Sequence, residues 1–559
     1  MNTSVSDAHG RVLLAWISGL GAACALAIPL QLAAVARLSG GRRESSFALG
    51  LLWVAIVGIA LAATASIESG AVRWLIRAAI AAGAAFAVTR VRRELPRALE
   101  AVLALSVVAL ALALNARAVA RIDANSIPVT TSAPPAREAS EHPLVVIGLD
   151  GLEWDKLNAG IAAGTLANFQ RVVERSLRSH LETFEPTWSP IIWNTISTGQ
   201  YAQRHHILHF AEQRFPGMRC GAQRLRSDSA LTPEFGGLRR LFTLAYDAGL
   251  MQELPIMGCN RKVPAFWDMV SAAGGSVAVV NWWASWPAYP VRGQLVSDNN
   301  PARAAYQNTE GHGNLEDIGI TEPPELLDRL SKLQVALPSE AEMLAGDLFR
   351  DLTPEAKAKL VGVGEQMTVL PIIVRSDEFM FRATRDLIAS ERPQLAVMYA
   401  TGVDNLSHRK VLGPTVIDRY YERVDALLGE LLAATPQDAR ILIVSDHGWV
   451  YTDAGYGHAE APPGVFMLSG PDITAGELGR LPHVRDVAPT VLALLGLPPS
   501  ADMPGRAIEE ALPAGVAARW SQRKPHAYAS LDGAAIERAG SAELQDETIE
   551  RLRALGYVE

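Results

Sequence analysis

The stretch "ILIVSDHGWVYTDAGYGH", Ile441–His458, joins a run of apolar residues to the adjacent pair Asp446 and His447. A short Ile/Leu/Val run bounded by polar residues and glycine predicts a strand that is buried on both faces, as in a parallel sheet. Asp446 and His447 would then lie where open α/β sheets bind ligands. Neighbouring side chains of a strand point to opposite faces, so the pair can share a metal ion only if the chain turns, which Gly448 permits. Taken alone, the stretch fits a hydrogen-bonded Asp and a loop His equally well.

Other strand-like runs end in the same kinds of side chain. "LVVIGLDG" ends in Asp150, and "LAVMYATGVDNLSH" places Asp404 and His408 after a strand predicted at 395–400. A spacing of four puts Asp404 and His408 on one face of a helix. Each pair alone is more often a surface feature, but together they form a set of candidate metal ligands: Asp150, Asp404, His408, Asp446, His447 and His458. Carboxylate and imidazole ligands suit zinc, with manganese as the alternative, and the set is larger than one four-coordinate ion needs. We therefore expect two Zn²⁺ ions.

The chain from about residue 143 to 559 alternates apolar strands with amphipathic helices. This alternation predicts an α/β fold, with a parallel sheet covered by helices on both faces. Two regions interrupt it, at about 213–262 and 301–390, and either could be a cap over the site or a surface insertion without function. The first contains Cys220 and Cys259, for which a single disulfide is an open option in an oxidising compartment.

The N-terminal part has the composition of a membrane region. Apolar runs at about 12–35, 47–67, 72–88 and 99–118 predict four transmembrane helices within residues 1–121. A signal peptide is the alternative for the first run, but the next long apolar run favours retained helices. Whether the third run spans is open, since Arg73 and Arg77 lie in its first turns.

The distribution of arginines predicts the orientation. Arginine-dense loops between the first two and the last two runs should face the cytoplasm, which places everything after Ala118 outside. Residues 122–142, rich in Pro, Ser, Thr and Ala, predict a linker. We thus expect a multi-pass protein of the inner (cytoplasmic) membrane whose catalytic domain is periplasmic or extracellular.

Overall composition excludes two classes of protein. With 49% hydrophobic and 20% charged residues, the chain of 559 residues is too apolar to be disordered. The net charge of −8 and the lack of a basic stripe exclude nucleic-acid binding.

Several stretches together resemble the alkaline phosphatase superfamily, and most closely its type I phosphodiesterase/nucleotide pyrophosphatase branch. They follow the family's order: "VVIGLDGLEWDKL", "SPIIWNTISTGQYAQRHHI", "GVDNLSH", "SDHGW", "GHAEAPPGVFMLSGP", "DVAPTVLALLGLP" and "LRALGYVE". The resemblance implies an alkaline-phosphatase-like catalytic domain at 143–559. It also implies one zinc ion held by Asp404, His408 and His458. The other would be held by Asp150, Asp446 and His447 and would contact the nucleophile.

The resemblance also points to the nucleophile. In the family a Thr or Ser precedes a helix that runs into a Thr-Gly pair, and counting back from Gly199 gives Ser189, with Thr187 as the runner-up. Ser189 precedes the helical "IIWNTIS", whose first amides could hold a phosphate oxygen. Ser189 followed by Pro190 also fits a helix N-cap with proline at the first helical position, a role compatible with catalysis.

Other features near these motifs bear on the substrate and on the packing of the domain. The family's phosphate-binding Asn is missing after Ser189, which puts nucleotide specificity in doubt, and the sulfatase signature is absent. The tryptophans of "VVNWWASWPAYP" could stack on a sugar or base, but core packing is the favoured reading. We assign His205 and His206 a structural role.

The resemblance implies a membrane-anchored, two-metal phosphoric ester hydrolase, most directly a phosphodiesterase with a covalent phospho-serine intermediate. Its substrate would be a phosphoester, such as a lipid head group or an envelope glycan. One alternative is a phosphoglycerol or phosphoethanolamine transferase acting on such molecules. Another is a non-catalytic, membrane-tethered binding protein, whose expected mark, lost ligands, is absent.

Overall fold

A computed structural model describes most of the chain after the predicted linker. It describes residues 142–214, 220, 252–299, 319–361, 367, 369–452, 455–458 and 461–529. The four predicted membrane spans precede residue 142 and so lie outside the described residues. Among the helices within these ranges, none combines the length and the apolar character that a membrane crossing requires.

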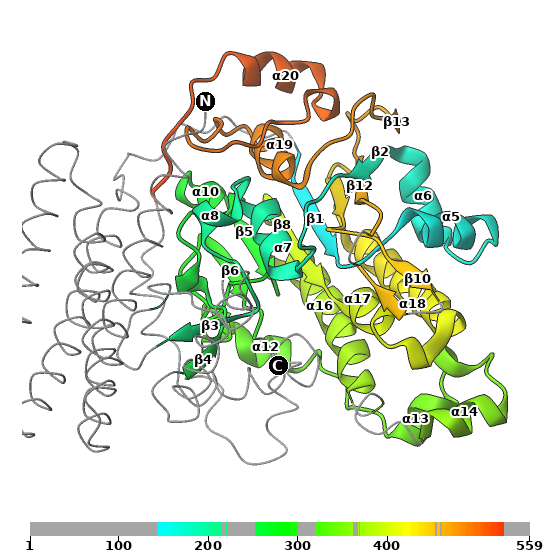
Figure 1. The fold of residues 1–559 in the computed structure, drawn as a ribbon. Coiled ribbons are helices and arrows are strands. Elements are labelled where there is room, and N and C mark those ends of the chain that lie inside the picture. Colours follow the sequence, from blue (N-terminus) through cyan, green and yellow to red (C-terminus); the bar gives the residue numbers. More distant parts are fainter. Residues whose placement is uncertain are drawn as a thin grey trace, which may run out of the picture. The chain divides into compact units, whose positions relative to one another are not determined.

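The described chain is built on one large sheet (Figure 1). Its nine strands run in the order β13-β2-β12-β9-β1-β8-β5-β6-β7. The central three are β9 (Arg440–Val444), β1 (Leu144–Leu149) and β8 (Leu395–Ala400), which pair in parallel and are fully buried. The others are β2 (Ser176–Leu181), β5 (Val277–Val280), β6 (Gly293–Val296), β7 (Thr321–Glu322), β12 (Gly464–Ser469) and β13 (Gly476–Glu477).

The prediction of a parallel sheet is right for the centre and wrong for two strands. β12 runs antiparallel to both β9 and β2, and β7 runs antiparallel to β6. The chain leaves β9 through the short strand pair β10 (Val450–Thr452) and β11 (Gly455–Gly457) and returns as β12. An antiparallel return needs no crossover helix, whereas a parallel one does. The sheet is therefore mixed.

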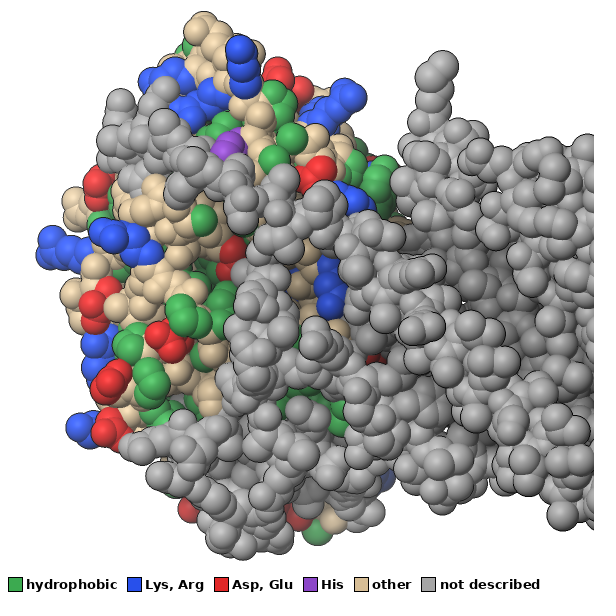
Figure 2. Space-filling model, turned by 90° about the vertical axis from the view of Figure 1, so that its left-hand side faces the viewer, with side chains coloured by type: hydrophobic (Ala, Val, Ile, Leu, Met, Phe, Trp, Pro, Cys, Tyr) green, Lys and Arg blue, Asp and Glu red, His purple; other side chains and the backbone are tan. Residues whose placement is uncertain are grey.

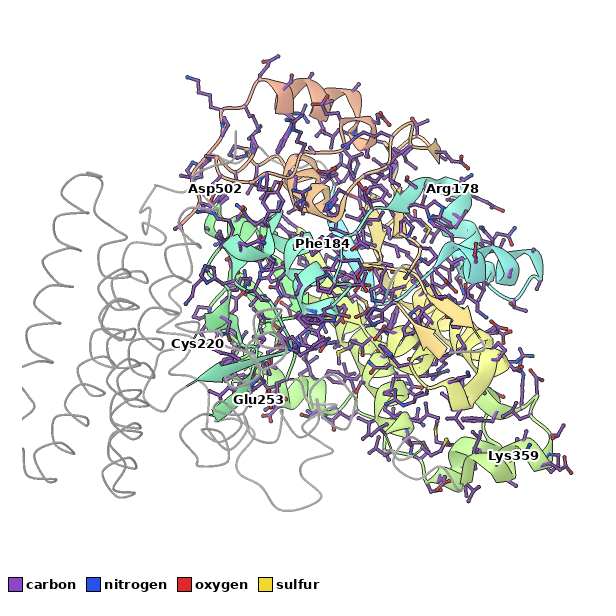
Figure 3. All side chains as sticks on the ribbon, viewed as in Figure 1. Arg178, Phe184, Cys220, Glu253, Lys359 and Asp502 are labelled. Atoms are coloured by element: carbon purple, nitrogen blue, oxygen red, sulfur yellow. A yellow bond between two sulfur atoms is a disulfide. The ribbon has the colours of Figure 1, made fainter. Side chains whose placement is uncertain are left out.

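Helices cover both faces of the sheet, as predicted. On β1, Leu144 and Val146 face a core layer with α7 (Ser189–Thr198), whereas Val145, Ile147 and Leu149 face the opposite layer. Side chains fill the space between sheet and helices on both sides (Figure 3). The α7 layer also contains α10 (Phe266–Ala272) and α19 (Val487–Leu494). The opposite layer contains α5 (Trp154–Ala162), α6 (Ala167–Arg175), α16 (Leu370–Glu391) and α18 (Gly413–Ala434).

The two predicted insertions take different forms. In the first, β3 (Ala211–Arg214) and β4 (Gln252–Pro255) form a separate antiparallel pair. In the second, the described residues include the short helices α12 (Leu326–Ser331), α13 (Glu340–Ala345) and α14 (Pro354–Val361), and then the long α16. Because α16 packs on β8 and β5, the last part of that region belongs to the helical layer of the sheet.

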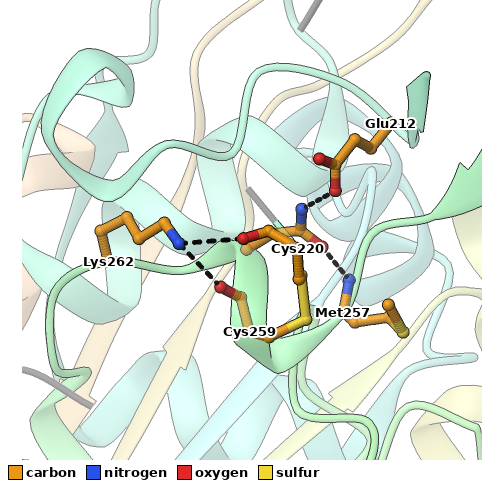
Figure 4. The surroundings of a disulfide bond; sticks show 6 residues. Glu212, Cys220, Met257, Cys259 and Lys262 are labelled. Carbon is orange, nitrogen blue, oxygen red and sulfur yellow. Dashed lines mark hydrogen bonds between the residues drawn. A yellow bond between two sulfur atoms is a disulfide. The ribbon is translucent and has the colours of Figure 1, made fainter. Parts of the chain in front are cut away.

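A disulfide joins Cys220 to Cys259, the pairing left open by the sequence (Figure 4). The two Cα atoms are 5.9 Å apart, and both cysteines are buried. Lys262 Nζ donates hydrogen bonds to the carbonyl oxygens of Cys220 (3.2 Å) and Cys259 (3.3 Å). The disulfide thus fixes residue 220 against the short turn that follows β4.

Charges of both signs are interspersed on the surface. On the face drawn in Figure 2, basic and acidic side chains alternate over the described part.

Gly464 in β12 gives a test of the mixed sheet. A Cβ added there would lie 2.1 Å from the carbonyl oxygen of Ser445, a backbone atom that cannot move aside easily. We expect Gly464→Ala to lower the free energy of unfolding by about 1–3 kcal/mol. At Gly476 of β13 the nearest atom would be 3.9 Å away, so Gly476→Ala is the matched control. Thermal unfolding of both variants checks this, and equal melting temperatures would contradict the packing of β12 against β9.

Candidate functional site

The candidate ligands gather at the carboxyl ends of three adjacent parallel strands, β9, β1 and β8. Leu149 of β1 pairs with Ala400 of β8, and Gly148 pairs with Val444 of β9, so the three strands end at one level. Polar side chains follow each end: Asp150 after β1, Asp446 and His447 after β9, and Asp404 within helix α17 (Gly402–Ser407) after β8. Residues far apart in the sequence thereby meet at one edge of the sheet.

One group of ligand atoms comprises Asp404, His408 and His458, which lie within 4.8 Å of one another. His408 Nε2 is 3.6 Å from Asp404 Oδ2, as the spacing of four predicts. His458 comes from the loop after β11 and stacks beside His447, with ring centroids 4.4 Å apart. This is the set expected for one metal ion.

A second group comprises Asp150, Asp404 and His447. His447 Nε2 lies 3.6 Å from Asp150 Oδ1 and 3.9 Å from Asp404 Oδ1. Asp446 was predicted as the third member. It borders this group, with Oδ2 at 3.4 Å from His447 Nε2, while its Oδ1 accepts a hydrogen bond from Gly151 N (3.2 Å). Asp404 thus belongs to both groups, which the sequence did not indicate.

The Nδ1 atoms of His447 and His458 both have hydrogen-bond partners outside the two ligand groups. His447 Nδ1 lies 3.0 Å from the carbonyl oxygen of Gly448, which can only accept, so Nδ1 carries the proton. The Thr187 hydroxyl donates to the carbonyl oxygen of His458 and lies 2.8 Å from its Nδ1, so it accepts from that ring nitrogen. Outer hydrogen bonds of this kind orient metal-binding histidines.

Buried atoms without partners indicate that a cation fits here. His447 Nε2 and Asp446 Oδ2 are buried and have no hydrogen-bond partner among the described residues. A ring nitrogen lone pair facing several carboxylates is the donor set that zinc takes. The residues present therefore fit a bound metal ion.

Without a bound cation, burial and the neighbouring charges shift the pKa values of the site residues. Burial, together with the charges of Asp446 and Asp404, raises the pKa of Asp150 well above its usual range. Burial and the charge of Asp404 raise the pKa of Asp446 to about 7. Burial and the neighbouring His447 lower the pKa of His458 to about 4, so this ring is neutral at pH 7 and free to act as a ligand. Neutral rings beside crowded carboxyl groups are what a divalent cation requires.

Ser189 is the hydroxyl that borders the second group. It is buried, and its Oγ lies 3.5 Å from Asp150 Oδ1. It is the first residue of α7 and not its N-cap, which is Trp188, and no side chain caps that helix. The predicted capping role is therefore wrong, because the hydroxyl faces Asp150 and not the helix amides.

The first amides of α7 are also less available than predicted. Ile191 N and Ile192 N both donate to the carbonyl oxygen of Trp188, and Pro190 has no N–H. The start of this helix therefore offers fewer donors to a phosphoryl oxygen than its sequence suggested.

Two aromatic residues that the sequence reading missed hold Asp150 in place. Trp193 Nε1 donates to Asp150 Oδ2 at 3.2 Å, and the Tyr399 hydroxyl donates to the same oxygen. Periodicity identifies both residues as buried, but it does not show which polar atom their tips reach.

The neighbouring tryptophans are core residues, as favoured. Trp282, Trp283 and Trp286 are 0%, 8% and 2% exposed. Trp283 Nε1 donates to the Tyr399 hydroxyl at 2.7 Å, and Tyr399 in turn donates to Asp150. The tryptophan cluster therefore helps to orient a candidate ligand. His205 is buried, and its ring forms hydrogen bonds with the Thr195 hydroxyl and the backbone N–H of Ile207. These contacts agree with a structural role.

Glu153 was also missed. Its Oε2 accepts a hydrogen bond from Trp449 N at 3.1 Å, which fixes the turn directly after His447 and Gly448. Burial raises the pKa of Glu153 to about 7. Glu153 follows Asp150 by three residues, so the sequence could have placed it near the site. The sequence could not have shown that Glu153 fixes the turn after His447.

Comparisons with known structures give weak overall similarities. A phosphonoacetate hydrolase from Sinorhizobium meliloti 1021 is 17% identical, with 56% of this chain and 58% of that chain covered and a TM-score of 0.33. Murine ectonucleotide pyrophosphatase/phosphodiesterase 5 is 11% identical, covering 65% and 97%, with a TM-score of 0.35. A mutant of the alkaline phosphatase PafA is 12% identical, covering 67% and 100%, with a TM-score of 0.36. This chain thus spans less than two thirds of the phosphonoacetate hydrolase. No curated protein matches its sequence.

The family assignment rests on a direct match of the sequence. The model of the type I phosphodiesterase/nucleotide pyrophosphatase family matches residues 144–460, which run from β1 through every candidate ligand to just past His458. This is more than half of the chain, and it confirms the resemblance carried by the motifs. The chain belongs to the type I phosphodiesterase/nucleotide pyrophosphatase family, a family of metal-dependent hydrolases.

Proposed function

We propose that the protein is a two-metal phosphodiesterase that acts through a covalent phospho-serine at Ser189. The observation that carries the proposal is the position of Ser189 Oγ, 3.5 Å from Asp150 Oδ1, beside the ligand group that shares Asp404 with the other group. A buried hydroxyl in that position is suited to nucleophilic catalysis beside metal ions.

The metals of this proposal are two Zn²⁺ ions, with Mn²⁺ as the alternative. Asp404, His408 and His458 would hold one ion, and Asp150, Asp446 and His447 the other, with Asp404 near both. When bound, such ions lower the pKa of a nearby hydroxyl and neutralise negative charge on the phosphoryl group.

The protein groups have separate tasks in the reaction. Ser189 Oγ loses its proton and forms a bond to phosphorus while the bond from phosphorus to the leaving oxygen breaks, and the leaving oxygen takes up a proton. Water then loses a proton and attacks phosphorus while the bond to Ser189 Oγ breaks, and Ser189 Oγ regains a proton. Trp193 and Tyr399 keep Asp150 in place throughout, because both donate to its Oδ2. An acceptor alcohol in place of water would turn the same steps into a transfer reaction.

The substrate class of the proposal is a phosphodiester, such as a lipid head group or envelope glycan held near a membrane. Two of the related structures are named as a nucleotide pyrophosphatase/phosphodiesterase and a phosphonoacetate hydrolase. Bis-aryl phosphate, aryl phosphate and aryl sulfate distinguish diesterase, monoesterase and sulfatase activity. We expect the first to be cleaved fastest.

The identity of the nucleophile is tested by replacing Ser189 and Thr187 separately with alanine. Ser189→Ala should lower the turnover of bis-aryl phosphate by about 10⁴-fold or more, because the attacking atom is lost. Thr187→Ala should lower it only about tenfold, through lost support of His458. Steady-state rates and thermal melting of both variants measure this. Near-normal turnover of Ser189→Ala beside an inactive Thr187→Ala would transfer the role to Thr187, and activity in both would reject the phospho-enzyme.

The metal content is tested at the shared ligand. Purified protein should contain about two zinc ions. His408→Ala, which alters one group, should reduce this to about one, whereas Asp404→Ala should reduce it further because Asp404 belongs to both groups. Elemental analysis measures the content. Equal zinc in the two variants would contradict a shared Asp404.

The location is a further part of the proposal. The disulfide of Cys220 and Cys259 supports an oxidising compartment, in agreement with the orientation predicted from the arginines. A C-terminal alkaline phosphatase fusion should therefore be active in cells and a C-terminal cytoplasmic fluorescent reporter dark. Strong fluorescence would instead favour three membrane spans.

A further inference from the structure

Asp377 of α16 is a buried carboxylate that binds the start of the ligand-bearing helix α17. It is 2% exposed. Its Oδ1 accepts a hydrogen bond from Thr401 N at 3.1 Å, and its Oδ2 accepts one from Gly402 N at 3.0 Å. A carboxylate at the first amides of a helix compensates donors that the helix itself cannot satisfy. Asp377 therefore fixes where α17 begins.

A third donor joins Asp377 to α18. The Tyr420 hydroxyl donates to Asp377 Oδ2 at 2.8 Å, and Tyr420 is buried. The contact is so close at Gly402 that an added Cβ there would lie 1.9 Å from the Tyr420 hydroxyl and 2.4 Å from Asp377 Oδ2. Helices α16, α17 and α18 are thus held together at one carboxyl group.

The helix fixed in this way carries the ligand that both metal groups share. Asp404 lies in the first turn of α17, two residues after Gly402, and His408 N donates to the carbonyl oxygen of Asp404 at 3.0 Å. A rotation of α17 would move Asp404, and with it His408 at the end of the helix, away from His447 and His458. No other candidate ligand is on this helix or on the helices that hold it.

We infer that Asp377, supported by Tyr420, is a positioning residue that sets the metal affinity of the site through the placement of Asp404 and His408. The inference rests on the proposed function, because it assumes that these residues bind metal. Asp377 belongs to neither ligand group and acts through the start of α17.

The chain offers a matched control in Asp425 of α18. This residue is 5% exposed, and its Oδ1 accepts hydrogen bonds from Asn168 N (3.0 Å) and Phe169 N (2.7 Å) at the start of α6. It thus binds the start of a helix as Asp377 does, but α6 carries none of the candidate ligands. A loss of stability common to both sites can therefore be separated from an effect on metal binding.

The experiment measures zinc affinity in the full-length protein. The unsubstituted protein and the variants Asp377→Asn, Tyr420→Phe and Asp425→Asn are stripped of metal and titrated with Zn²⁺ against a chromophoric chelator, and their metal-free melting temperatures are recorded. We expect Asp377→Asn to weaken zinc binding by about 10- to 100-fold, and Tyr420→Phe to weaken it less. Asp425→Asn should lower the melting temperature without changing zinc affinity by more than about twofold.

Each outcome bears on the inference. Equal zinc affinities in Asp377→Asn and Asp425→Asn would overturn it and leave the proposed function standing. If Asp377→Asn does not fold, Tyr420→Phe decides, since it removes only one donor; an unchanged affinity in that variant would overturn the inference. An unsubstituted protein that binds no zinc would overturn the proposed function and this inference together.

Discussion

The repulsion between three buried carboxyl groups is the constraint on which the site depends. Asp150, Asp404 and Asp446 are each fully buried at the ends of three central strands. Burial and the charges of the neighbouring carboxyl groups raise the pKa values of Asp150 and Asp446. Buried charges in proteins are paired or bind metals. The fold therefore assembles an arrangement that a divalent cation would complete.

The surrounding residues hold this arrangement against its own repulsion. Tyr399 and Trp193 bind one oxygen of Asp150, Gly151 N binds Asp446, and Asp377 binds the start of the helix that carries Asp404. Gly151 has a φ of +69°, and an added Cβ would lie 3.2 Å from Asp404 Cβ, so β1 and α17 approach closely only because this position is glycine. The ligands are placed by the backbone and by a ring of outer hydrogen bonds. Such bonds tune metal affinity.

The sequence predicted which Asp and His side chains would meet because each one follows a strand or lies in the loop after one. A buried apolar run that ends in Asp or His places that side chain at the edge of a parallel sheet. The antiparallel return of β12 was not predictable from apolar runs, which do not encode strand direction. Trp193, Tyr399 and Asp377 were missed for a related reason: periodicity shows that a residue is buried, but not which distant atom its polar end reaches. That Asp404 belongs to both groups likewise depends on the pairing of β1 with β8 and β9, which the sequence does not specify.

The most direct test of the account is to locate the metal ions. Crystals of the zinc-loaded protein, measured on both sides of the zinc absorption edge, should show two anomalous peaks at the carboxyl ends of β9, β1 and β8. One peak should lie beside His408 and His458, the other beside Asp150 and His447, with Asp404 between them. A single peak, or peaks only at surface residues, would contradict the central claim that this carboxylate cluster exists to bind two cations.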